Sequence, residues 1–136
     1  MADVGQVIGG KYKLIRVVGD GGMGTVYEAE HLLLGTRVAV KVLHPDMVQR
    51  TGLIDRFLQE ARVSAQIQNP HVVRVTDVDR SSDGVAFLVM ELLQGEPLSK
   101  TLERERALDI AVACDYTLQI LDALESAHAI GVVHRF

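Results

Sequence analysis

Short stretches rich in valine, isoleucine and threonine dominate the first third of the chain, and a helical spacing of apolar residues appears further on. Such stretches, bounded by glycine-rich turns, predict β-strands at residues 11–18, 25–30 and 37–43, and later at 72–78 and 85–92. Between residues 53 and 67 apolar residues recur at the spacing of an amphipathic helix. After Gly95 a short helix at 98–104 and a long one at 109–130 are predicted. This order indicates an α+β fold.

The long predicted helix has an unusually narrow polar side. Its polar positions step by four, three and four residues, at Asp115, Gln119, Asp122 and Ser126, and therefore form one stripe. A helix that is apolar over most of its circumference is expected to be buried on several sides. The few residues that follow cannot cover it. Three explanations stay open: the helix packs against the strands, it dimerises, or the subdomain that would cover it is missing.

Composition and charge narrow the class of protein. With 136 residues, the chain corresponds to one ordinary domain or to a piece of a larger one. The net charge of −4 and the scattered basic residues argue against a nucleic-acid partner. The single cysteine, Cys114, suits a reducing compartment. The N-terminal residues lack the features of a signal peptide, and no stretch of about 18 apolar residues predicts a transmembrane helix. We therefore expect a cytoplasmic protein without a membrane segment.

The glycine-rich segment from Gly19 to Gly24 matches the pattern G-x-G-x-x-G. In a dinucleotide-binding fold a helix follows these glycines, whereas here a strand-like segment, Thr-Val-Tyr-Glu-Ala, comes next. The Gly-Lys-Ser/Thr ending of a P-loop is also absent. A glycine-rich hairpin between two strands can cover a nucleotide, because backbone N–H groups approach phosphates closely where no Cβ intervenes. The other interpretation is a plain flexible hairpin.

A lysine in the third predicted strand is a candidate phosphate ligand. In the run Val-Ala-Val-Lys at 38–41, Ala39 and Lys41 share one face, because side chains alternate along a strand. A small residue beside a cation leaves room for a flat ring and a charge for its phosphates, and Val26 is placed to cover the same ring. Alternatively, Lys41 extends from a buried strand into solvent.

Glu60 is a candidate partner for that lysine. It lies at or beside the apolar face of the predicted helix at 53–67, three residues after Phe57. A carboxylate at such a position is costly unless a cation neutralises it, and Lys41 on a neighbouring strand is one candidate. A surface pair with Arg56, four residues earlier on the same helix, is the alternative.

Together these segments resemble the N-lobe of a bacterial-type serine/threonine protein kinase. The resemblance rests on VGDGGMGTVY at 18–27, VAVK at 38–41 and RFLQEA at 56–61. It continues in order through NPHVV at 69–73, FLVME at 87–91, Gly95, Ala127-His128 and GVVHR at 131–135. The implied fold is a five-stranded antiparallel sheet with helix C, in an N-lobe at about residues 9–94. Residues 95–136 would hold the hinge end, helices D and E and the start of the catalytic loop.

The resemblance implies roles for individual residues. Lys41 would bind the α- and β-phosphates of ATP, with Glu60 as its catalytic partner. Met90 would be the gatekeeper, and the backbones of Glu91 and Leu93 would bind the adenine edge. The implied ATP-binding residues are Val18, Gly19, Asp20, Gly21, Gly22, Met23, Gly24, Thr25, Val26, Ala39, Lys41, Met90, Glu91 and Leu93. The positions of the regulatory spine are Ser64, Val75 and His134, although serine is polar for that role.

The chain departs from the family pattern at its last residue. The catalytic loop of the family reads His-Arg-Asp, and here Phe136 follows His134 and Arg135. Phenylalanine cannot accept the proton of a substrate hydroxyl. The family's protein ligands for Mg²⁺ are missing as well, so we expect no metal site in this chain. Two hypotheses follow: a kinase sequence cut short, inactive alone and of unknown protein substrate, or a non-catalytic nucleotide-binding module that docks on a full-length kinase through helix 109–130.

Overall fold

The computed structural model describes residues 2–134, which form two compact units. The first unit comprises the residues up to Gln66 together with Val73–Leu92, and it contains the whole sheet. The second comprises Ile67–Val72 and the residues from Leu93 onward, with two helices.

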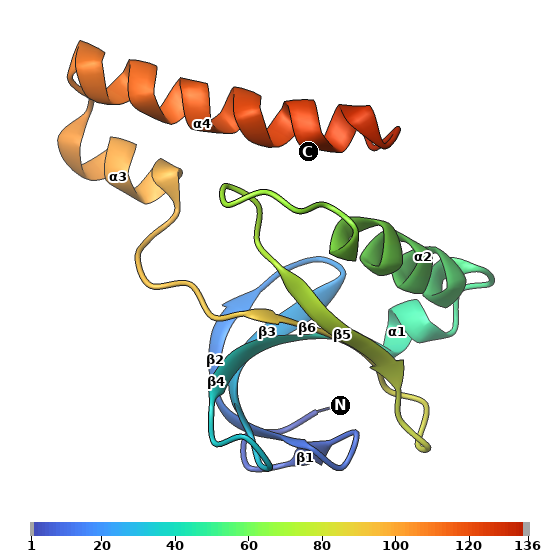
Figure 1. The fold of residues 1–136 in the computed structure, drawn as a ribbon. Helices are drawn as coiled ribbons and strands as arrows, with labels where there is room; N and C mark the ends of the chain where they lie inside the picture. Colours follow the sequence, from blue (N-terminus) through green and yellow to red (C-terminus); the bar gives the residue numbers. More distant parts are fainter. Residues whose placement is uncertain (1, 135–136) are drawn as a thin grey trace. The chain divides into compact units, whose positions relative to one another are not determined.

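The first unit is built on a six-stranded antiparallel sheet that curls strongly (Figure 1). In the order β1-β2-β3-β4-β6-β5, every pair of neighbours is antiparallel. The strands are β1 (Val7–Ile8), β2 (Tyr12–Asp20), β3 (Gly24–His31), β4 (Arg37–Leu43), β5 (Val75–Arg80) and β6 (Ala86–Glu91). The five predicted strands are confirmed as elements. The pattern missed β1, because two residues are too short to show a periodicity.

One face of the sheet forms the main hydrophobic core. Alternate residues of β4, Val40 and Val42, are buried there, while Ala39 and Lys41 belong to the opposite face. The core side chains are Ala2, Ile8, Tyr12, Leu14, Tyr27, Ala29, Val40, Val42, Phe87 and Val89. The hydroxyl groups of the two tyrosines are paired: Tyr12 donates to Asp77 at 2.7 Å and Tyr27 to the carbonyl oxygen of Ala2 at 2.7 Å. The core therefore leaves no buried hydroxyl without an acceptor.

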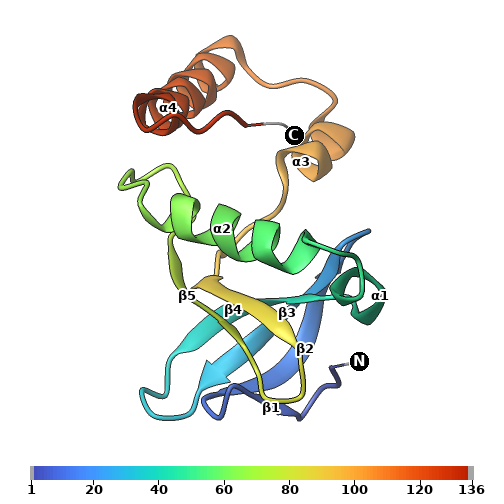
Figure 2. The same cartoon turned by 90° about the vertical axis from the view of Figure 1, so that its right-hand side faces the viewer.

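Helix α2 (Leu53–Ala65) lies on the other face of the sheet (Figure 2). Its buried residues Ile54 and Phe57 pack with Leu43 and Ala86 in a second hydrophobic cluster. A short helix, α1 (Pro45–Val48), connects β4 to this region. Because Leu43 lies two residues after Lys41 on the same face, α2 covers the part of the sheet next to the lysine.

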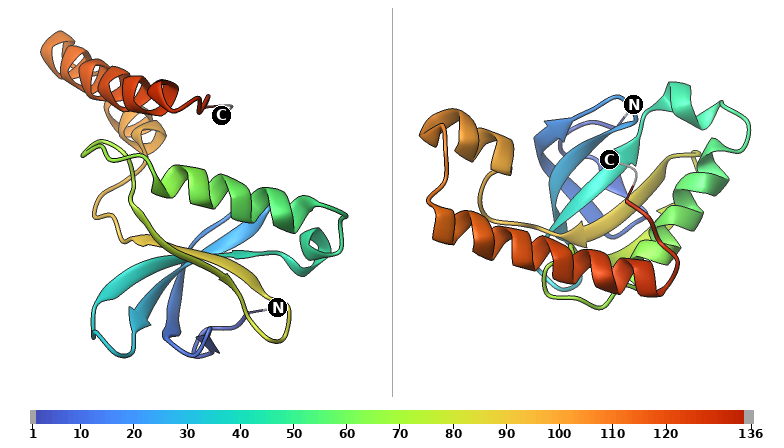
Figure 3. Two further views of the ribbon diagram at one scale, coloured as in Figure 1. Left: turned by 45° about the vertical axis from the view of Figure 1, so that its right-hand side comes forward. Right: turned by 90° about the horizontal axis from the view of Figure 1, so that it is seen from above.

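The second unit contains α3 (Leu98–Glu105) and the long straight helix α4 (Ile110–Ala129) (Figure 3). The polar stripe of α4 binds the segment Ile67–Val72: Nδ2 of Asn69 donates to Oγ of Ser126 at 2.8 Å and to the backbone oxygen of Asp122 at 3.2 Å. Most large apolar side chains of α4 stay exposed, among them Ile110 at 84% and Leu118 at 66%, whereas Ala127 is buried. The segment Ile67–Val72 thus binds only the C-terminal part of the stripe, at Asp122 and Ser126.

One predicted boundary differs in the structure and another is confirmed, each for a local reason. Strand β5 begins at Val75 and not at residue 72, since the N–H of Val72 donates to the carbonyl of Asn69 in a turn, at 3.1 Å. The end of α4 agrees with the sequence: Gly131 has a φ of 80°, and Val132 N–H donates to the carbonyl of Ala127. None of the helices within residues 2–134 has the length and apolar character that crossing a bilayer requires.

Candidate functional site

The strand register gathers four predicted site residues on one face of the sheet. Lys41 of β4 lies opposite Val26 of β3, and Ala39 lies opposite Met90 of β6. Residues paired in this way point to the same face. This is the face that does not carry Val40, and α2 covers it beyond Lys41. Ala39 is buried, whereas Val26, Lys41 and Met90 are half-buried. The sequence-based grouping of a valine, an alanine and a lysine around one space is therefore supported by the register.

The proposed partner of the lysine is placed differently. Glu60 lies on α2 one turn after the buried Phe57, with its side chain exposed. Among residues 2–134 the ion pairs involve other side chains, and Glu60 pairs neither with Lys41 nor with Arg56. The structure thus puts both residues on the same side of the sheet without bringing their charges together, and the pairing stays a prediction.

The glycine-rich segment forms the hairpin between β2 and β3. Within it, Gly21 N–H donates to the carbonyl of Gly24 at 3.1 Å, and Oγ1 of the buried Thr25 donates to Oδ1 of Asp20 at 2.7 Å. A Cβ on Gly19 or Gly22 would meet no atom within 4 Å, so these positions face open space. Open backbone of this kind is available to a ligand.

Gly24 differs from the other glycines of the hairpin. A Cβ at this position would lie 2.3 Å from the carbonyl oxygen of Val42 on β4, which is far inside van der Waals contact. Gly24 is therefore required by the close approach of β3 to β4. The sequence pattern contains this glycine, but it does not reveal that its role lies in strand packing.

His44, which belongs to none of the sequence motifs, also contacts the hairpin. Its backbone N–H donates to the carbonyl of Met23 at 2.9 Å, and its Nε2 lies 2.8 Å from the carbonyl oxygen of Gly21. No sequence signal predicts these contacts, since they join residues more than twenty positions apart.

The remaining predicted residues lie at the ends of the strands or beyond them. Val18 and Met23 are exposed apolar residues of the hairpin. Glu91 ends β6, and its carboxylate accepts from Arg74 N–H at 2.9 Å. Leu93 begins the second stretch of the other unit and is exposed.

The three spine positions are divided between the two units. Val75 lies opposite Met90 in the register, Ser64 is half-buried on α2, and His134 is the last described residue. Arg135 and Phe136 lie outside the described residues. The prediction that Phe136 replaces the catalytic aspartate is therefore not addressed by the structure.

The shifted pKa values belong to residues away from this face. Burial, together with the hydrogen bond to Asp77, raises the pKa of Tyr12 well above its usual range. The hydrogen bond from Arg104 lowers the pKa of the exposed Glu96. Tyr12 belongs to the main core and Glu96 precedes α3. Neither shift indicates an acid or base at the predicted site, and both have a structural cause.

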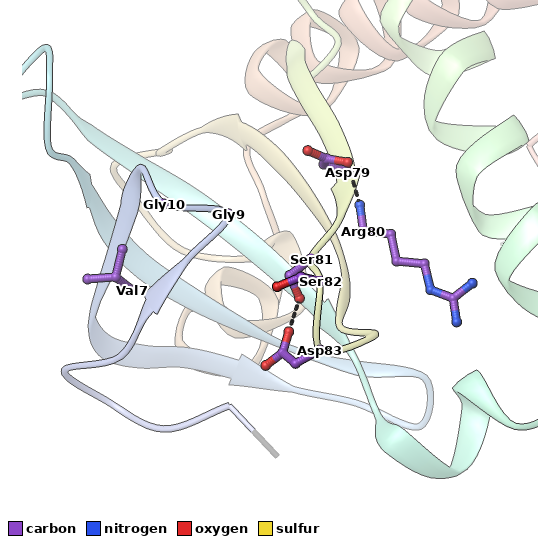
Figure 4. Close-up of a pocket in the computed structure, with 8 residues that line it drawn as sticks. All are labelled: Val7, Gly9, Gly10, Asp79, Arg80, Ser81, Ser82 and Asp83. Carbon is purple, nitrogen blue, oxygen red and sulfur yellow. Dashed lines mark hydrogen bonds between the residues drawn. The ribbon is translucent and has the colours of Figure 1, made fainter.

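A cavity of about 460 Å³ lies elsewhere in the first unit (Figure 4). The turn after β1 and the turn between β5 and β6 line it. Its residues are Val7, Gly9, Gly10, Asp79, Arg80, Ser81, Ser82 and Asp83. None of the predicted site residues is among them, so this cavity is separate from the face around Lys41.

Comparison with known proteins agrees with this arrangement. Residues 12–135 match the protein kinase domain family. The serine/threonine-protein kinase PknA of Mycobacterium tuberculosis is 43% identical over 136 residues, which cover 97% of this chain and 32% of that protein. A probable serine/threonine-protein kinase of Clostridium perfringens, CPE1738, is 36% identical over 97% of this chain and 19% of its own length.

A solved structure shares the fold. The crystal structure of the M. tuberculosis PknI kinase domain has a TM-score of 0.82 at 29% identity, and covers 99% of this chain and 56% of that one. The chain thus spans about a third of the length of PknA, and little more than half of the PknI kinase domain. The glycine-rich hairpin and the strand that carries Lys41 agree with the family match. This chain therefore belongs to the protein kinase family and resembles its bacterial serine/threonine members.

Proposed function

We propose that this chain supplies the ATP-binding part of a serine/threonine protein kinase. The observation that carries the proposal is the single sheet face on which Val26, Ala39, Lys41 and Met90 come together beside the glycine-rich hairpin. Adenine would lie between the small and branched apolar side chains, with the backbones of Glu91 and Leu93 at its edge. The ammonium group of Lys41 would neutralise the α- and β-phosphates. In this proposal residues 9–94 are the N-lobe and 95–136 begin the C-lobe.

Phosphoryl transfer needs more than nucleotide binding. It depends on positioning, charge neutralisation and an acceptor for the proton of the substrate hydroxyl. Phe136 has no such acceptor group, so we propose that the chain alone binds ATP without transferring its γ-phosphoryl group. Transfer to protein serine or threonine is proposed for a kinase that contains the complete catalytic loop.

Magnesium is the usual companion of ATP in this family, where it neutralises phosphate charge. Within residues 2–134 no group of three or more His, Cys, Asp or Glu side chains is arranged to hold a metal ion. Mg²⁺ beside a nucleotide needs only one or two protein carboxylates besides the phosphates, so the expectation that this chain holds no metal site stays a prediction. A cytoplasmic location, expected from the sequence, stays a prediction.

Replacement of Lys41 by methionine tests the proposal. Methionine keeps the length of the side chain and removes its charge, so we expect ATP affinity to fall roughly 10- to 100-fold, as the loss of a charge-assisted hydrogen bond of about 1.5–3 kcal/mol predicts. Calorimetric titration with ATP measures this, and circular dichroism checks the fold. Lys13→Met, an exposed lysine on β2, is the matched control and should bind ATP like the wild type. A folded wild-type chain that does not bind ATP contradicts the proposal.

The exposed apolar residues of α4 favour a second candidate, a module that docks on a full-length kinase. The positions concerned are Ile110, Val112, Tyr116, Leu118, Ile120 and Leu121. Large apolar side chains left exposed in such number are typical of interaction sites. In sedimentation velocity, a mixture with a full-length PknA-type kinase should then form a complex that the double variant Leu118→Asp, Leu121→Asp does not form. Sedimentation of the two wild-type proteins as separate species contradicts the docking proposal and leaves ATP binding untouched.

A further inference from the structure

His44 occupies an unusual position between the lysine strand and α1. It follows β4 directly, three residues after Lys41, and is the N-cap residue of α1. The side chain of an N-cap residue ordinarily accepts a hydrogen bond from its own helix. Here it makes no such bond, and the ring contacts the glycine-rich hairpin instead. The side chain of His44 therefore serves the hairpin and not the helix.

The contacts define the hydrogen-bonding state of the ring. Nε2 of His44 lies 2.8 Å from the carbonyl oxygen of Gly21. A carbonyl oxygen can only accept, so Nε2 must carry the hydrogen. Oδ1 of Asp20 lies 3.4 Å from the same Nε2, and it also accepts the hydroxyl of Thr25. The Nε2–H of His44 thus faces two acceptors at the end of β2: the carbonyl oxygen of Gly21 and the carboxylate of Asp20.

Little else holds the tip of the hairpin. The β3–β4 ladder begins only at Gly24, paired with Leu43. Within residues 2–134, the hydrogen bonds that reach residues 21–23 from outside the hairpin both come from His44, one from its backbone and one from its ring. Side chains cannot substitute for them, because glycine stands at two of the three tip positions.

We propose that His44 is a positioning residue, which fixes the tip of the glycine-rich hairpin relative to Lys41 and so prepares it for the phosphates of ATP. This inference rests on the proposed ATP-binding function. His44 and Lys41 belong to one continuous backbone segment, so a bond from His44 to Gly21 sets the distance between hairpin and lysine before the nucleotide arrives. A preorganised site loses less conformational entropy on binding.

Two substitutions of His44 test this role: one removes the N–H donor, and the other retains a donor. His44→Phe keeps the aromatic ring and removes the N–H, and we expect ATP affinity to fall roughly three- to tenfold, as one net hydrogen bond predicts. Adenosine affinity should not change, since the ring N–H faces acceptors of the hairpin that would cover the phosphates. His44→Gln keeps an N–H donor of similar reach and should restore most of the ATP affinity. His128→Phe, an exposed histidine on α4, is the matched control.

Two measurements do not depend on nucleotide. Hydrogen exchange at the amides of residues 21–23 should be faster in His44→Phe than in the wild type and in His44→Gln. The ¹⁵N chemical shifts of the wild-type imidazole should show hydrogen on Nε2. If His44→Phe fails to fold, the role of His44 is tested by the exchange and ATP affinity of His44→Gln and by the imidazole shifts of the wild type.

Several results overturn the inference. They are an Nε2 without hydrogen, equal losses in the phenylalanine and glutamine variants, unchanged exchange at the tip, or equal losses of ATP and adenosine affinity. A folded wild-type chain that binds no ATP contradicts the proposed function instead. The exchange and tautomer results then still decide whether His44 holds the hairpin.

Discussion

Replacing Gly24 by alanine is expected to destabilise the first unit by on the order of 3 kcal/mol and to abolish ATP binding. The added Cβ would lie 2.3 Å from the carbonyl oxygen of Val42, 3.1 Å from its carbonyl carbon and 3.3 Å from the Cα of Leu43. All three are backbone atoms in a central strand, so they cannot move away as a flexible side chain would. The strands must separate at the point where their pairing begins, which displaces the hairpin from Lys41. Urea denaturation and calorimetric titration measure the two effects.

Gly22→Ala is the matched control for this result. The same substitution two residues earlier meets nothing within 4 Å, and the backbone there lies outside the left-handed region. We expect a change in stability within about 0.5 kcal/mol, as for other surface substitutions. Equal stability of Gly24→Ala and Gly22→Ala would contradict the claim that the close approach of β3 to β4 requires glycine at position 24.

Replacing Phe87 by alanine is expected to lower the free energy of unfolding by about 3–5 kcal/mol. Its ring is 1% exposed and belongs to the main core. It stacks edge-on against Tyr12 with centroids 6.0 Å apart, and it packs so closely on Gly9 that a Cβ there would lie 2.7 Å from the ring. The lost ring therefore leaves a cavity between β1, β2 and β6, which rigid strands cannot close.

Urea denaturation monitored by circular dichroism measures this loss. Leu33→Ala is the control, since Leu33 is 82% exposed in the turn between β3 and β4 and should change the stability by less than about 0.5 kcal/mol. Phe87→Leu fills part of the space, so its free energy of unfolding should lie between those of Phe87→Ala and Leu33→Ala. Similar midpoints for all three variants would show that the ring is not part of a packed core.

The elements and their faces could be predicted to a large extent. Alternation in β4 separates Ala39 and Lys41 from Val40 and Val42, and the structure confirms this separation. The grouping with Val26 was also expected, because the hairpin connects neighbouring strands. Residue patterns of this kind reflect the chain's local geometry, which depends on residues only a few positions apart.

The long helix α4 shows how far a local pattern reaches. Its four polar positions share one side, while the apolar remainder leaves burial, dimerisation and a missing subdomain open. In the second unit Asn69 binds Asp122 and Ser126 of the stripe, while Leu118 is exposed. A periodicity tells which residues share a side of a helix, but the side that is covered depends on a segment fifty residues away.

The resemblance to the kinase family, the order of the elements and the residues that share the lysine face could all be inferred from the amino-acid sequence. Contacts in the folded chain, by contrast, explain why Gly24 must be glycine, bring the ring of His44 to the hairpin, and place Lys41 and Glu60 on one side of the sheet. The physical reason is the same in each case. Contacts between strands, or between a strand and a loop, depend on register and on the path of the backbone between them, and neither is written in the spacing of apolar residues.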